Sequence, residues 1–119
     1  MDSNRQTQRE QNLEIADPGH AGAIPVDQGS GVCPITTAAA ETRTLAIPKF
    51  IGQRLGLICK TYAVGDAVIT VASAINQTGN NTITLNTAGD YVELVGVKIA
   101  SVLAWRVVVN DGATLSTVA

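Results

Sequence analysis

The chain has 119 residues and a mass of 12.3 kDa, which suffices for one small domain but not for two full hydrophobic cores. Hydrophobic residues make up 45% of it and charged residues only 15%, which argues against a disordered acidic chain and against a coiled coil. The net charge of −2 gives no electrostatic reason to bind nucleic acid. One His, two Cys and four aromatic residues supply few catalytic groups. We therefore expect a structural or binding role and not an enzyme.

The N-terminal segment differs in composition from the rest of the chain. It is rich in Gln, Asn and Arg, and its apolar residues near the end are Leu13 and Ile15. We expect residues 1–15 to be flexible, either as a disordered terminus or as an arm that orders only on a neighbouring subunit, and residues 16–119 to form the folded domain. The polar start lacks the apolar stretch of a signal peptide, and no apolar run is long enough for a spanning helix. Synthesis in the cytoplasm and no membrane partner are expected.

Short runs rich in Val, Ile and Thr alternate with turn sequences from residue 17 onward. The turn signals recur about every 8–12 residues, which is typical of a β-sandwich or barrel. The sequence predicts an all-β fold, an antiparallel β-sandwich or jelly-roll-like barrel of about eight short strands. The predicted strands are residues 23–26, 32–36, 42–47, 54–60, 67–72, 81–86, 90–99 and 102–110.

Alternation along these runs predicts which side chains point inward. Leu45 and Ile47 are expected on one face of their strand, and Thr42 and Thr44 on the other. The last two predicted strands are largely apolar on both faces. Such strands are buried on both sides, by a second sheet or by another subunit. The turn at residues 100–101 is expected to join these two strands as an antiparallel hairpin.

No residue pattern predicts a cofactor or a metal site. Cys33 and Cys59 are expected to be buried thiols, with a disulfide between neighbouring strands left open. His20 follows a turn and has no catalytic frame around it. The aspartates at turns and strand ends lack the dense spacing of a calcium loop; they are Asp66, Asp90 and Asp111. Trp105 is expected in the core, with an aromatic anchor at a subunit contact as the alternative.

Six segments carry a resemblance that spans most of the chain after residue 15. They are residues 16–25 (ADPGHAGAIP), 40–46 (AETRTLA), 51–55 (IGQRL), 68–76 (VITVASAIN), 94–98 (LVGVK) and 105–115 (WRVVVNDGATL). With them the sequence resembles a group of small proteins from the structural modules of tailed bacteriophages, associated with head decoration (cement) proteins. The resemblance implies a β-rich module on the capsid exterior of the virion. It also implies a homotrimer that stabilises the shell by bridging subunits of the major capsid protein.

Within this resemblance, the arm and a few other residues are the candidates for capsid or subunit contact. Leu13 and Ile15 would be apolar anchors, and Arg5 and Arg9 would form ion pairs at the rim. The remaining candidates are His20 with its loop, the loop 76–81 and Trp105. One alternative is a trimeric fibre or spike component that binds a host-surface glycan. A hydrolase or carbohydrate-active enzyme that uses Asp66 or Asp90 is a third alternative.

Overall fold

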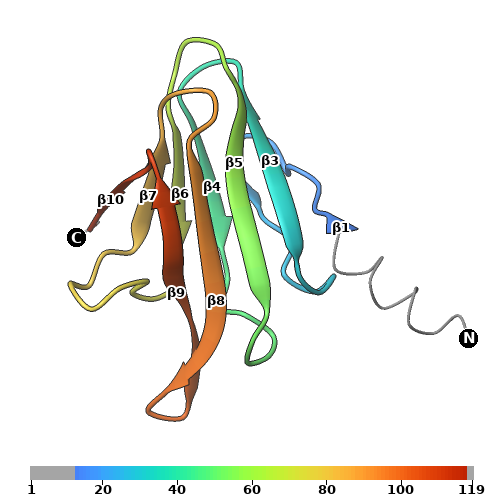
Figure 1. The fold of residues 1–119 in the computed structure, drawn as a ribbon. Helices are drawn as coiled ribbons and strands as arrows, with labels where there is room; N and C mark the ends of the chain where they lie inside the picture. The colour runs from blue at the N-terminus through green and yellow to red at the C-terminus, as the bar shows by residue number, and fades with distance from the viewer. Residues whose placement is uncertain (1–12, 118–119) are drawn as a thin grey trace, which may run out of the picture.

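The computed structural model of the protein describes residues 13–117, which form ten β-strands and no helix (Figure 1). Accordingly, no helix in this part of the chain is long and apolar enough to cross a membrane. The strands are β1 (Leu13–Glu14), β2 (Gly22–Ala23), β3 (Gly31–Thr37), β4 (Glu41–Leu45), β5 (Arg54–Tyr62), β6 (Ala67–Val71), β7 (Thr82–Leu85), β8 (Tyr91–Ile99), β9 (Val102–Asp111) and β10 (Thr114–Ser116).

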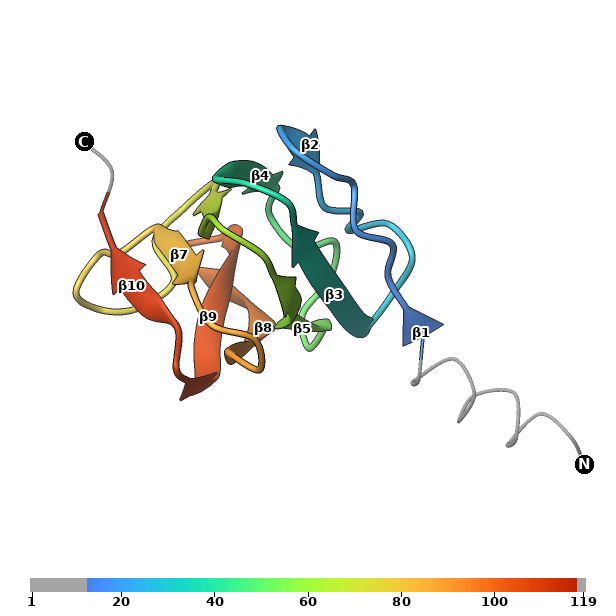
Figure 2. The ribbon, with the colours of Figure 1, turned by 90° about the horizontal axis from the view of Figure 1, so that it is seen from above.

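The strands form two five-stranded sheets that lie face to face, as the view from above in Figure 2 shows. Sheet A has the order β1-β3-β5-β8-β9, and sheet B has the order β10-β7-β6-β4-β2. Both sheets keep free edges, so the fold is not a closed barrel. The all-β prediction is confirmed, and the barrel prediction is wrong.

The prediction of an antiparallel fold is also wrong, because both sheets are mixed. Strand β3 runs parallel to β1 and β5, and β4 runs parallel to β2 and β6. The cause is the path of the chain, which changes sheet after each of its first five strands. Successive strands of one sheet therefore point the same way. Antiparallel pairs arise where the chain returns within its own sheet, as in β6–β7 and in β8–β9.

All eight predicted strands are present, with ends that differ by a few residues. Two further strands, β1 and β10, were not predicted; they are 2 and 3 residues long. The β8–β9 hairpin turns at Ala100 and Ser101, which both have positive φ, at 50° and 69°. That geometry suits the twist of a two-residue hairpin and confirms its position.

The core lies between the sheets and consists mainly of the inward side chains that alternation predicted. Ile47 is an exception: it is exposed, because β4 ends at Leu45 and Pro48 follows shortly after. The second side chain of β4 that points inward with Leu45 is that of Arg43, which is fully buried. The largest other fully buried side chains are Trp105, Ile15, Ile35, Leu45, Leu55, Leu57, Ile69, Ile75, Ile83, Leu85 and Leu94.

Cys33 and Cys59 are free, buried thiols on the neighbouring strands β3 and β5. Cys33 pairs with Leu57 and Cys59 with Ile35, so the two cysteines are offset by two positions. Strand spacings place such Cα atoms roughly 8 Å apart, beyond the span of about 4.4–6.8 Å that a disulfide bridges. Burial raises the pKa of Cys33 to about 12 and also raises that of Cys59.

Both thiols are therefore expected to be inert in the native protein. At pH 8, a thiol-specific reagent such as DTNB should label the native chain at least a hundredfold more slowly than the urea-unfolded chain, because the thiolate is the reactive form and is scarce. Absorbance at 412 nm follows the reaction. Rapid labelling of one native thiol would contradict the buried placement.

Candidate functional site

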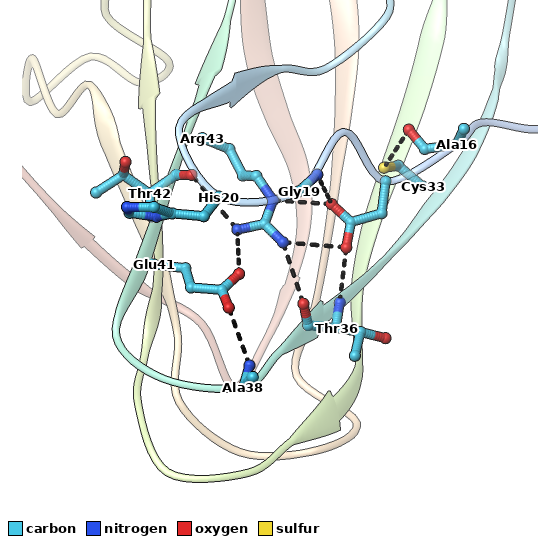
Figure 3. Close-up of polar contacts among 10 residues, drawn as sticks. Ala16, Gly19, His20, Cys33, Thr36, Ala38, Glu41, Thr42 and Arg43 are labelled. Carbon is cyan, nitrogen blue, oxygen red and sulfur yellow. Dashed lines mark hydrogen bonds and ion pairs between the residues drawn. The ribbon is translucent and has the colours of Figure 1, made fainter.

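The most extensive polar cluster surrounds Arg43, on the inner face of β4 (Figure 3). Its Nε and Nη2 donate to the two carboxylate oxygens of Asp17, at 2.8 and 3.0 Å. Nη1 donates to Glu41 Oε1 at 2.9 Å and to the carbonyl of Thr42 at 3.4 Å. Nη2 also donates to the carbonyl of Thr36 at 3.1 Å. All five guanidinium N–H groups thus have partners.

Asp17 lies in the segment that connects β1 of sheet A to β2 of sheet B. Its carboxylate also accepts the backbone N–H groups of Thr36 and Gly19, at 3.0 and 3.1 Å. Burial alone would raise the pKa of Asp17, but hydrogen bonds from Arg43, Thr36 and Gly19 outweigh it and hold the pKa below its usual value. Because every donor of Arg43 is occupied, the cluster is a clamp that ties the connecting segment to both sheets. It offers no group to a ligand.

The predicted contact residues are not brought together by the fold. Arg5 and Arg9 lie outside the described residues. Leu13 is half-buried in β1, and Ile15 is only 1% exposed and belongs to the core. His20 is exposed, and its Nδ1 accepts the backbone N–H of Thr42 at 3.2 Å. Ile15 is therefore occupied within its own domain, so its side chain is not available as an anchor on another protein in this conformation.

Trp105 is fully buried on β9, and its indole Nε1 donates to the carbonyl of Ala46 at 2.8 Å. A buried Trp needs such a partner for its N–H group. The core placement of Trp105 is confirmed. Its side chain has no surface left for a partner in this conformation.

The outer faces of the two sheets differ in chemistry. The outer face of sheet B carries a row of aligned residues in which Thr42, Val68, Thr84 and Thr114 pair across four strands. Thr44 and Thr70 form the next pair on this face. We call Thr42, Thr44, Thr84 and Thr114 the threonine face. Hydroxyl groups keep this face compatible with water.

The outer face of sheet A mixes charged and apolar residues, because Arg54, Glu93 and Arg106 lie on it among several valines. It carries Val32 of β3, Val95 and Val97 of β8, and Val109 of β9, which we call the valine face. Val32 and Val109 remain 41% and 43% exposed, and Val95 and Val97 are half-buried. Arg106 pairs with Val95 on this face, and its buried Nε has no hydrogen-bond partner within residues 13–117. An apolar patch with an unsatisfied donor is typical of a surface that another molecule covers.

A shallow hollow of about 180 Å³ lies within the valine face, where Gly56 and Glu93 stand between Val32 and Val109. Arg54 Nη1 donates to Glu93 Oε2 at 2.9 Å, and the hydroxyl of Tyr91 donates to Glu93 Oε1 at 2.9 Å. Gly56 has no side chain there, and a Cβ atom at this position would lie 2.8 Å from the Tyr91 hydroxyl. Burial and the bond to Glu93 raise the pKa of Tyr91. The hollow therefore presents an aromatic ring, a guanidinium and a carboxylate together.

Sequence reasoning missed Arg43 and the group at the hollow. The signal for Arg43 was its position two residues before Leu45, which puts both on the same face of a strand. The hollow had no such signal, because it joins residues of β3, β5 and β8 that only the sheet order brings together.

Within residues 13–117, no group of three or more His, Cys, Asp and Glu side chains is placed to hold a metal ion. No protein-family model matches the chain, and no curated protein is detectably similar to it. The valine face and the hollow within it are thus the candidate site that the geometry itself offers.

Proposed function

We propose that this chain is a decoration protein of a bacteriophage head, which binds the major capsid protein on the outside of the shell and stabilises it by bridging capsomers. The proposal joins the sequence resemblance to one structural observation, the contrast between the two outer faces. A sheet face in contact with water is normally lined with polar residues, as the threonine face is. The valine face surrounds one ion pair, that of Arg54 and Glu93, but exposes Val32 and Val109 and carries Arg106, whose buried Nε has no partner among residues 13–117; these features favour contact with another protein chain.

We assign the valine face to contact between copies of the chain, in the homotrimer that the resemblance implies. Because β8 and β9 are largely apolar on both faces, we expect both faces to be covered. Sheet B covers only the inner face. A decoration protein repeats its contacts many times over a shell, so each contact can be modest and the assembly still firm. The mixed sheets do not show the jelly-roll-like arrangement expected from the sequence, which stays a prediction.

The test uses two matched double variants and purified phage heads that lack the chain. Val32→Asp with Val109→Asp places two charges on the valine face, and Thr44→Asp with Thr114→Asp places the same charges on the threonine face. All four positions are exposed, so the core is unchanged. Sedimentation velocity is expected to give trimers for the wild type and the threonine-face variant and monomers for the valine-face variant. The valine-face variant should also bind heads at least tenfold more weakly.

The outcomes separate the two parts of the proposal. A wild-type protein that fails to bind heads contradicts the decoration role. A wild-type monomer that still binds heads contradicts the homotrimer alone. Equal behaviour of the two double variants would remove the valine face from the interface.

A glycan-binding fibre or spike component is the second candidate, and the hollow is the feature that favours it. Aromatic rings stack on sugars, and paired carboxylate and guanidinium groups can bond their hydroxyls. Tyr91, Glu93 and Arg54 supply these groups in one place. Location of the chain at the tail in micrographs of the particle, with saturable binding of a host-surface glycan, would favour this candidate over decoration.

A further inference from the structure

Exposed apolar side chains gather at one end of the sandwich. Of the nine large apolar side chains that are exposed within residues 13–117, five lie in the loop 46–53 or at the tip of the β8–β9 hairpin. They are Ile47, Phe50, Ile51, Ile99 and Val102, which we call the apolar end. Phe50 and Ile51 are 46% and 63% exposed. The loop and the hairpin tip lie at the same end of the molecule, at the bottom of Figure 1.

The loop that carries Phe50 and Ile51 is fixed in place by its backbone. The N–H of Gly52 donates to the carbonyl of Gly96 at 2.8 Å, and the N–H of Gly96 donates to the carbonyl of Gln53 at 2.8 Å. A Cβ atom at position 96 would lie 2.6 Å from the carbonyl oxygen of Phe50, so Gly96 permits this close approach. The loop is thereby held against β8, next to the hairpin.

Gln53 adds a second set of constraints, because its side chain is buried and fully used. Its Oε1 accepts the N–H of Lys49 at 2.7 Å. Its Nε2 donates to the carbonyls of Val26 and Gly29, at 2.9 and 3.2 Å. The apolar end is therefore ordered before any partner arrives, which lowers the entropy cost of binding.

The charge at this end is opposite to that of the whole chain. Residues 46–53 and 95–106 contain Lys49, Lys98 and Arg106 and no carboxylate. The loop 24–30, to which the Gln53 side chain is bonded, adds one carboxylate, Asp27, and no cation. Three cations minus one anion leave this end at +2, whereas the chain carries −2.

We infer that the apolar end docks on a different protein whose contact surface is apolar at its centre and acidic at its rim. This inference rests on the proposed function, under which the partner is the major capsid protein. A symmetric contact with a second copy would bring two surfaces with the same excess of positive charge together, which is repulsive. A bilayer is disfavoured because three basic residues fall short of the about four to eight that membrane-surface recognition uses.

Binding to purified heads that lack the chain tests this inference, at two salt concentrations. Phe50→Ser with Ile51→Ser is expected to bind at least tenfold more weakly, because the two central apolar contacts are lost. Lys49→Glu with Lys98→Glu should bind at least tenfold more weakly at low salt, with a smaller loss at high salt. Val64→Ser and Lys60→Glu are the matched controls. Both residues are exposed and lie toward the opposite end of β5, so binding within twofold of wild type is expected.

Each remaining outcome overturns the inference in a distinguishable way. If the wild type binds heads and both end variants bind equally well, the apolar end is not the contact and the decoration role stands. If the wild type does not bind heads, the proposed function fails and the inference fails with it. Flotation with phosphatidylglycerol vesicles that the Phe50→Ser, Ile51→Ser variant abolishes would assign the end to lipid. Self-association that this variant abolishes would assign it to a second copy.

Discussion

Replacing Arg43 with alanine is expected to lower the free energy of unfolding by about 3–5 kcal/mol, the cost of removing one partner from a buried ion pair. The change leaves the carboxylate of Asp17 and the carbonyl of Thr36 without their charged donor. Single domains are stable by only about 5–15 kcal/mol, so this is a large share of the total. Urea denaturation followed by circular dichroism measures the loss.

Arg54→Ala is the matched control for this prediction. Arg54 also pairs with a carboxylate at 2.9 Å, that of Glu93, but its side chain is 55% exposed. An exposed pair contributes about 0.2–1 kcal/mol, so the control should stay close to wild type. Equal losses in the two variants would show that the burial of Arg43 adds nothing to its role.

The pH dependence of stability gives the Arg43 prediction a second readout. The pKa of Asp17 is held below its ordinary value of 3.8, so the native state favours the ionised carboxylate. The resulting stabilisation is complete above that ordinary value and disappears as the pH falls through the lower native pKa. The difference in stability between wild type and Arg43→Ala should therefore be constant near neutral pH and shrink in acid. A difference that grows in acid would contradict the clamp.

The strands were predictable because their signals are local. Alternation and turn residues mark each strand within its own ten or so residues, and the hairpin turn at residues 100–101 lies where the sequence placed it. The valines of the valine face follow from the same signal, since β8 and β9 are largely apolar on both faces. The sequence pattern could not predict which of the two faces packs against sheet B.

The parallel pairing was not predictable, because strand partners are set by the path of the chain between sheets. Short connections such as the one between β3 and β4 fit a hairpin within one sheet as well as a crossing to the other. The chain crosses, and Arg43 shows one physical reason. Its guanidinium bonds Thr36 of β3 and Asp17 of the connecting segment at once, which requires β3 and β4 to face each other.

The apolar end could not be predicted from the sequence, for a related reason. Ile47 continues the alternation of β4, so it looked like an inward residue, and the position of the strand end decided otherwise. The cation excess there combines the loop 46–53 with the hairpin tip, which are about fifty residues apart along the chain. Backbone bonds of Gly96 to Gly52 and Gln53 join the loop to the hairpin.

Two N-terminal truncations, of residues 1–12 and of residues 1–15, are expected to differ in stability. The described contacts of the domain begin at Leu13, so only the longer truncation removes any of them. Deleting residues 1–15 removes the pairing of Leu13 with Gly31 and the bond from the N–H of Ile15 to the carbonyl of Val32, at 2.8 Å. It also removes the buried side chain of Ile15, and loss of such a side chain costs about 2–5 kcal/mol. Deleting residues 1–12 leaves every described contact in place, so its unfolding free energy should match that of the full chain within about 0.5 kcal/mol.

This difference decides which truncation can test the arm. A chain that lacks residues 1–15 would bind phage heads weakly through instability alone, whatever Arg5 and Arg9 do. A chain that lacks residues 1–12 keeps the fold and loses both arginines, so weaker binding at unchanged stability would assign the loss to the arm. Ile15→Ala in the full chain is the companion variant, with lower stability and the arm intact. Full stability in Ile15→Ala would contradict the core role of Ile15, and undiminished head binding after removal of residues 1–12 would exclude those residues, Arg5 and Arg9 included, from the contact.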